Sequence, residues 1–325
     1  MTSLFAGLEV DKSLRPVAGA FRFDLNACLS SVVALEATVS DDASTAGALG
    51  TNRIGNGVVI DAEGLVLTIG YLITEAEEVI LTTGDGRRVQ AHVLGVDPAT
   101  GFGLVYALEP LNLPALPLGD SRSVGKDDTV LVAGAGGRAH ALAGVLLARA
   151  PFAGYWEYYL DEALFVGPAH PHWSGAALVN AAGELVGVGS LYVEQRAADG
   201  EVQPLNMFVP VDLLRPILAD LKAGRPARAP RPWIGVIAQE VDSLVVVLDV
   251  SDGGPADQAG LEQGDIVRAI GGEKVTDLAG FYRLLWALGP PGVMARVIVQ
   301  RDQQMISIDV QTIDRSTRMK KHRLN

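Results

Sequence analysis

Short runs of β-branched and aliphatic residues, each bounded by glycine, aspartate or asparagine, recur through the first two thirds of the chain and limit its fold more than any other feature. Pairs of such runs joined by tight turns predict antiparallel hairpins. Three pairs are evident: residues 58–60 with 65–68, 79–82 with 89–93, and 177–179 with 185–188. Because helical periodicity is almost absent between residues 27 and 209, this region is predicted to be an all-β barrel or sandwich.

The last third of the chain follows a different pattern. Apolar residues at helical spacing over 211–221 are followed by Gly224 and Pro226, which end a helix, and by an arginine- and proline-rich stretch up to residue 232. Such a change of composition is typical of a linker between domains. Beyond it, a helix predicted at 278–288 alternates with strands, which indicates a small α+β module. The strands are predicted at 244–248, 295–300 and 306–310.

Composition excludes several classes of function. The 26 basic and 38 acidic residues give a net charge of −12, so nucleic acid is not expected as a partner, since phosphate-binding surfaces need clustered lysine and arginine. The single cysteine, Cys28, excludes an intrachain disulfide and a cysteine-rich zinc site. No signal peptide is evident, and the uncharged stretch 165–183 contains prolines and histidines that make it a poor membrane span. A cytoplasmic protein without membrane contact is therefore expected.

Several spaced motifs recur along the chain. The segments 55–61 and 64–68 are similar to the sequences GSGVIID and GYILTN, and 97–100 is similar to DPKT. Residues 174–180, 183–188, 208–211 and 231–236 are similar to SGGPLVN, GEVIGI, FAIPI and RPWLGV. Together these motifs resemble the HtrA (Deg-type) family of serine proteases.

The resemblance covers residues 27 to 313 in the family's order and implies a mainly β chain. It implies a trypsin-like double β-barrel followed by a small α+β PDZ domain. The predicted division is an N-terminal arm at 1–25, a trypsin-like domain at 26–222, a linker at 223–232, a PDZ domain at 233–313 and a basic flexible tail at 314–325.

The resemblance also assigns the three positions of the family's catalytic triad. Its serine falls on Ser174, its histidine on Tyr71 and its aspartate on Gly101. A phenol with an ordinary pKa near ~10 is a poor acceptor for the serine proton at neutral pH, and glycine supplies no carboxylate to orient a base. Loss of triad members costs on the order of 10⁴ to 10⁶ in rate. These replacements predict a pseudoprotease in which Ser174 is retained but does not cleave.

The surroundings of Ser174 leave alternatives open. His172 stands where the family has a glycine of the oxyanion hole, and its side chain penalises the positive φ that glycine allows. His172 could instead act as a replacement base, or form a metal site with His170, although no third ligand is visible nearby. The glycine-rich segment 134–137 is read as a turn between strands and not as a nucleotide loop. No metal and no cofactor are expected.

The PDZ-like segment retains more of the family's pattern. Residues 254–256, 259–261 and 264–267 are similar to the family's GSPAEKAGL and GDVI motifs. The resemblance implies that Trp233, Ile234, Gly235 and Val236 form the loop whose backbone N–H groups bind a peptide carboxylate, and that the next strand accepts an extended peptide. Phe281 and Leu285 line a side-chain pocket in this interpretation; packing in the domain core is the alternative.

Three functions follow from these features. The preferred one is a catalytically inactive HtrA-like scaffold or regulator that binds protein C-termini or extended peptides in its PDZ groove. The alternative is an active serine endopeptidase that uses Ser174 with a rearranged base. The third is a regulator of an active relative in a mixed oligomer. If the chain does not join such an oligomer, the resemblance implies a homo-oligomer, a trimer as in the family. The aromatic residues Phe5, Phe21 and Phe23 of the arm are candidates for such a contact.

Overall fold

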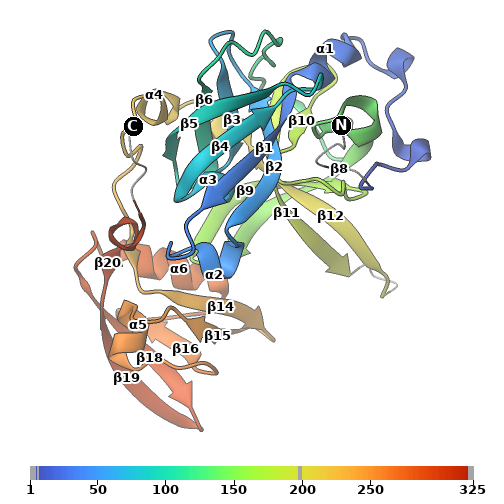
Figure 1. Cartoon of the computed structure of the whole chain (residues 1–325). Coiled ribbons are helices and arrows are strands. Elements are labelled where there is room, and N and C mark those ends of the chain that lie inside the picture. The colour runs from blue at the N-terminus through green and yellow to red at the C-terminus, as the bar shows by residue number, and fades with distance from the viewer. Residues whose placement is uncertain (1–4, 6, 197–199, 321–325) are drawn as a thin grey trace. The chain divides into compact units, whose positions relative to one another are not determined.

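The computed structural model describes residue 5, residues 7–196 and residues 200–320 (Figure 1). The chain divides into two compact units. The first unit consists of Met1–Ala150, Glu162–Ala227 and Lys320–Asn325, and the second of Pro151–Asp161 and Arg228–Met319. The second unit thus includes a short segment from within the range predicted for the trypsin-like domain.

Two closed antiparallel barrels of six strands each form the first unit (Figure 1). The first barrel has the strand order β1-β2-β3-β6-β5-β4 and the second the order β10-β11-β12-β9-β8-β7. The strands are β1 (Val32–Val39), β2 (Asn52–Val59), β3 (Leu65–Ile69), β4 (Ala76–Thr82), β5 (Arg88–Val96), β6 (Phe102–Ala107), β7 (Thr129–Ala133), β8 (Ala141–Gly154), β9 (Tyr158–Gly167), β10 (Ala177–Val179), β11 (Leu185–Arg196) and β12 (Val202–Pro210).

All three hairpins expected from the sequence are present. Val58 pairs with Leu67, Val79 with Ala91, and Ala177 with Val188. Alternate aliphatic side chains of these strands point into the barrels, where their burial supplies the main favourable term in folding. The second barrel is filled by side chains that include Val130, Val132, Leu142, Leu146, Leu164, Val166, Leu178, Val186 and Phe208.

Helices are short in the first unit. The helix expected over 211–221 is divided into a 3₁₀ turn, η5 (Val211–Leu213), and α4 (Leu218–Lys222). Pro216 lies between them, and proline has no N–H to continue a helical hydrogen-bond series. The other helical elements are α1 (Leu25–Ser30), α2 (Ala46–Leu49), α3 (Gly70–Ile73), η1 (Lys12–Leu14), η2 (Ala18–Ala20), η3 (Ser121–Ser123) and η4 (Gly137–His140). Among the described residues, none of the helices is long and apolar enough to cross a membrane.

The second unit is a small α+β domain. Its main sheet has the order β14-β15-β16-β18-β19, with β17 paired to β16, while β13 and β20 form a separate pair. Its elements are β13 (Pro232–Trp233), β14 (Val236–Val241), β15 (Leu244–Val250), α5 (Pro255–Ala259), β16 (Ile266–Ile270), β17 (Glu273–Lys274), α6 (Leu278–Ala287), β18 (Met294–Arg301), β19 (Gln304–Gln311), β20 (Ile313–Asp314) and η6 (Arg315–Arg318). The predicted mainly β fold, two barrels followed by an α+β domain, is confirmed.

Candidate functional site

Ser174 lies in the loop between β9 and β10, and a buried asparagine of the first barrel holds this loop in place. The Asn56 side-chain amide donates to the carbonyl oxygens of His172 (3.0 Å) and Ser174 (2.9 Å), and its Oδ1 accepts from the N–H of Ala135 (2.8 Å). The next residue, Gly175, has φ +74°, and a Cβ there would lie 2.0 Å from the carbonyl oxygen of Asn56. Only glycine therefore fits beside Ser174.

Tyr71 reaches Ser174 from α3. Its hydroxyl is 2.8 Å from the Oγ of Ser174 and 2.7 Å from the carbonyl oxygen of Ser190 in β11. A carbonyl oxygen can only accept, so the single phenolic proton is donated to Ser190, and the phenol accepts the hydrogen bond of the Ser174 hydroxyl. Burial raises the pKa of Tyr71 above its ordinary value. The partner of Ser174 is therefore a neutral phenol.

Gly101 lies beside the element that carries Tyr71. The carbonyl oxygen of Gly101 accepts a hydrogen bond from the N–H of Gly70, the first residue of α3 (2.6 Å). Gly101 itself has φ +82°, in the left-handed region. The structure thus brings Ser174, Tyr71 and the backbone of Gly101 into one neighbourhood, with no carboxylate from position 101.

The backbone N–H of His172, at the position where the family has an oxyanion-hole glycine, is already used. It donates to Nδ1 of the His170 ring at 2.9 Å. Because this nitrogen accepts, the His170 proton lies on Nε2, which donates to the carbonyl oxygen of His140 (3.0 Å). Burial lowers the pKa of His170 to about 4, so its ring is neutral at pH 7.

The His172 ring is occupied elsewhere and has no hydrogen bond to Ser174. It packs against Phe5 with ring centroids 4.2 Å apart, and its Nε2 is buried without a hydrogen-bond partner among the described residues. Burial lowers its pKa to about 4. The described residues contain no group of three or more histidine, cysteine, aspartate or glutamate side chains placed to hold a metal, so the His170–His172 metal alternative gains no support.

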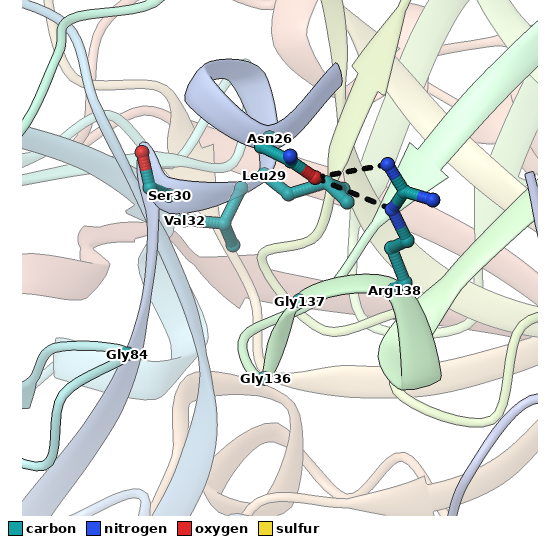
Figure 2. Close-up of a pocket in the computed structure, with 8 residues that line it drawn as sticks. All are labelled: Asn26, Leu29, Ser30, Val32, Gly84, Gly136, Gly137 and Arg138. Atoms are coloured by element: carbon teal, nitrogen blue, oxygen red, sulfur yellow. Dashed lines mark hydrogen bonds between the residues drawn. The ribbon is translucent and has the colours of Figure 1, made fainter. Parts of the chain in front are cut away.

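A pocket of about 220 Å³ lies apart from Ser174 and Tyr71, neither of which lines it. Figure 2 shows Arg138 extending towards Asn26, and the guanidinium donates to the Asn26 Oδ1 at 3.1 and 3.2 Å. Gly136 and Gly137, both with positive φ, form the turn between β7 and β8 at one side of this pocket. The expected turn at 134–137 is thus present.

In the second unit, Ile234 and Gly235 connect β13 to Val236, the first residue of β14. Gly235 has φ +82°, and the N–H groups of Gly235 and Val236 both point to the carboxylate of Glu157. Trp233 is nearly buried, and the Arg315 guanidinium lies 5.8 Å from its ring centroid. Phe281 and Leu285 of α6 are fully buried in the core cluster that also contains Ile234 and Val236.

Three residues of these sites were not foreseen from the sequence: Asn56, Ser190 and Glu157. Asn56 replaces the serine of the family's GSG motif, and that departure was the available signal. Ser190 takes part through its backbone carbonyl, which no side-chain pattern reveals. Glu157 lies in a segment without a recognisable motif.

Comparison with known proteins agrees with this architecture. A model for the trypsin-like peptidase domain matches residues 55–188, and a PDZ domain model matches residues 232–312. A probable periplasmic serine endoprotease DegP-like of Pseudomonas fluorescens is 27% identical over 79% of this chain and 55% of its own length. The putative serine protease HhoA of Synechocystis is 29% identical over 79% of this chain and 70% of its own. The chain spans about half the length of the DegP-like relatives it matches.

Solved structures show the same fold. The HtrA-type protease AlgW with decapeptide has a TM-score of 0.53 at 22% identity, covering 89% of this chain and 98% of its own. The serine endoprotease from Yersinia pestis has a TM-score of 0.52 at 23% identity, covering 90% and 98%. The expectation of a cytoplasmic protein is wrong, because the DegP-like relatives are named periplasmic. The chain thus carries a trypsin-like peptidase domain followed by a PDZ domain, and the proteins to which it is similar are named DegP-like and HtrA-type proteases.

Proposed function

We propose that this chain is an HtrA-like pseudoprotease that binds protein C-termini or extended peptides through its PDZ domain and acts as a scaffold or regulator. The pairing of Ser174 with the neutral phenol of Tyr71 carries the first part of this proposal. The periplasmic names of the relatives support an envelope location. A solved HtrA-type neighbour with a decapeptide, together with the PDZ match, supports the peptide partner.

The chemistry of the site favours inactivity at two steps. Attack of the Ser174 hydroxyl on a carbonyl requires a base that takes its proton, and a neutral phenol with a raised pKa does not do so at pH 7. Attack also creates an oxyanion that needs free backbone donors, whereas the N–H of His172 is bonded to the His170 ring. Each deficiency alone lowers the rate, and together they act on proton transfer and on charge stabilisation.

The alternative function is an active serine endopeptidase, and the names of the relatives favour it. The two functions are separated by turnover of casein and of fluorogenic peptides by the wild type beside Ser174→Ala. We expect both to give the same background rate. A wild-type rate well above that of Ser174→Ala would establish the endopeptidase instead.

Covalent labelling gives an independent test that needs no knowledge of the substrate. A fluorophosphonate probe at neutral pH forms an adduct with an activated serine, and trypsin serves as the positive control. We expect no adduct at Ser174, since activation requires the base that Tyr71 does not provide. A mass shift mapped to Ser174 would overturn the inactive assignment.

Assembly with copies of itself, or with an active relative, is the remaining part of the proposal. The arm contributes less free apolar surface than its sequence suggests, because Phe5 is only 5% exposed and packs on His172. Light scattering of the full chain and of a chain without residues 1–25 tests the contribution of the arm. Monomers in both cases would remove self-assembly from the proposal.

A further inference from the structure

The carboxylate-binding loop of the PDZ domain is occupied by a carboxylate of the same chain. Oε1 of Glu157 accepts hydrogen bonds from the N–H of Gly235 at 2.9 Å and of Val236 at 3.3 Å. Two consecutive backbone N–H groups that converge on one oxygen form an anion-binding site. Glu157 lies at the tip of the hairpin formed by β8 and β9, and this tip belongs to the second unit.

The residues before Glu157 contact β14 and α6 through their backbone. The carbonyl oxygen of Tyr155 accepts from the N–H of Ala238 in β14 at 2.9 Å. Strand β14 is an edge of the six-stranded sheet, so its outer side has backbone groups that a further chain can pair with. The hydroxyl of Tyr282 in α6 donates to the carbonyl oxygen of Gly154 at 2.7 Å. Contacts with β14 and α6 are those expected of a peptide ligand.

Side chains of the hairpin tip also contact the second unit's core. Ala153 and Tyr159 pack against the core cluster of the second unit, and the Arg283 guanidinium of α6 lies 5.3 Å from the Tyr159 ring centroid. The tip is held in shape by stacking of Trp156 on Tyr158, with ring centroids 5.4 Å apart. Backbone, carboxylate and apolar contacts therefore all come from one segment, 153–159.

The internal ligand is imperfect in one respect. Oε2 of Glu157 is buried and has no hydrogen-bond partner among the described residues. Burying this oxygen without a partner makes docking of Glu157 less favourable. When a peptide α-carboxylate binds the same N–H groups instead, the Glu157 side chain is released and this cost is removed. Burial raises the pKa of Glu157 to about 7 and outweighs the charge of Arg315, which favours the ionised form.

We propose that the β8–β9 tip is an internal ligand that closes the PDZ groove, and that a peptide with a free C-terminal carboxylate binds by displacing Glu157 from Gly235 and Val236. This inference rests on the proposed peptide-binding function of the domain. It specifies how that site is regulated. In the protein without a ligand, the β8–β9 tip fills the groove, and an external peptide competes with the tip for the same N–H groups.

Peptide affinity tests the displacement in the full-length protein. The probe is a set of fluorescein-labelled decapeptides with a free C-terminus and randomised last three residues, and amide-terminated twins serve as the ligand control. The variant Glu157→Ala removes the internal carboxylate, and Glu273→Ala removes an exposed carboxylate of β17 in the same unit as the matched control. We expect Glu157→Ala to bind free-carboxylate peptides at least tenfold more tightly than the wild type and Glu273→Ala to bind like the wild type.

Hydrogen exchange tests whether Glu157 occupies the loop at Gly235 and Val236, and it does so whether or not any peptide in the set binds. We expect the amides of Gly235, Val236 and Ala238 to exchange faster in Glu157→Ala, with unchanged exchange in β18 and β19 showing that the unit remains folded. Unchanged exchange at these three amides would overturn the internal ligand. Equal peptide affinity of wild type and Glu157→Ala would overturn displacement while leaving the peptide site intact. Absence of binding by both proteins, with faster exchange in the variant, would instead reject the peptide-binding function.

Discussion

The hydroxyl of Tyr71 connects Ser174 to the second barrel. The phenol accepts from Ser174 and donates to the carbonyl oxygen of Ser190, so it serves as a structural bridge between α3 and β11. We expect Tyr71→Phe to destabilise the first unit by about 1–3 kcal/mol, because the Ser190 carbonyl loses its donor in a buried position. Thermal denaturation measures this effect, with Tyr106→Phe, an exposed tyrosine, as the control. An unchanged melting temperature would show that the bridge is not needed.

Glu157 makes the second residue-scale prediction. Burial raises the pKa of Glu157 from its ordinary 4.5 to about 7 when it is docked in the loop. A raised pKa means that protonation favours the docked state, so docking strengthens as pH falls from about 7 towards 4.5 and is weakest above 7. We expect free-carboxylate decapeptides to bind severalfold more weakly at pH 5.5 than at pH 7.5 in the wild type. The same titration of Glu157→Ala should lack this dependence; an equal dependence in both would assign it to other groups.

The sequence locates Ser174, Tyr71 and Gly101 because Ser174 begins a recognisable motif and the other two lie just after one. It does not reveal that Tyr71 donates to Ser190, which the fold brings close, or that the N–H of His172 is bonded to His170, which depends on the conformation of their loop. Side-chain patterns describe residue types, whereas these hydrogen bonds depend on tertiary position.

At the scale of the elements, the β8–β9 hairpin differs most from what its sequence suggests. Its strands have the alternation expected of a barrel, yet its tip is part of the second unit. The helix at 211–221 is a smaller departure, where Pro216 outweighs the apolar spacing. Local patterns predict strand pairing well, because neighbouring strands in sequence pair here, but they do not predict which surface a hairpin tip contacts.

The contact between α6 and the hairpin tip gives a prediction for these elements. Tyr282→Phe removes the hydroxyl that donates to the carbonyl oxygen of Gly154 and leaves the buried ring in place. Losing one such bond costs about 0.5–1.5 kcal/mol, so we expect the tip to dock less firmly and free-carboxylate decapeptides to bind about threefold to tenfold more tightly. Fluorescence anisotropy measures the change, and Tyr106→Phe is again the control. Weaker binding by Tyr282→Phe would mean that the hydroxyl serves the external peptide instead.

At the scale of the whole molecule, each unit has a hydrophobic core of its own and a buried polar network of its own. In the first unit, Asn56 satisfies three backbone groups around Ser174. In the second, the fully buried carboxylate of Asp265 accepts two hydrogen bonds from Arg301, both at 2.7 Å. Separate cores indicate separate cooperative unfolding, because cooperativity follows the packed cluster.

Scanning calorimetry of the full chain should therefore resolve two transitions. We expect Asn56→Ala to lower only the transition of the first unit, because the carbonyl of His172 and the N–H of Ala135 lose their side-chain partner. Asp265→Ala should lower only the other transition, by about 1–3 kcal/mol, because it removes a buried carboxylate that accepts from Arg301 and from the N–H of Glu262, while Arg301 keeps its ion pair with Glu262. The two variants serve as controls for each other. One transition that shifts equally in both variants would mean that the cores unfold together, and stability would then be a property of the whole chain.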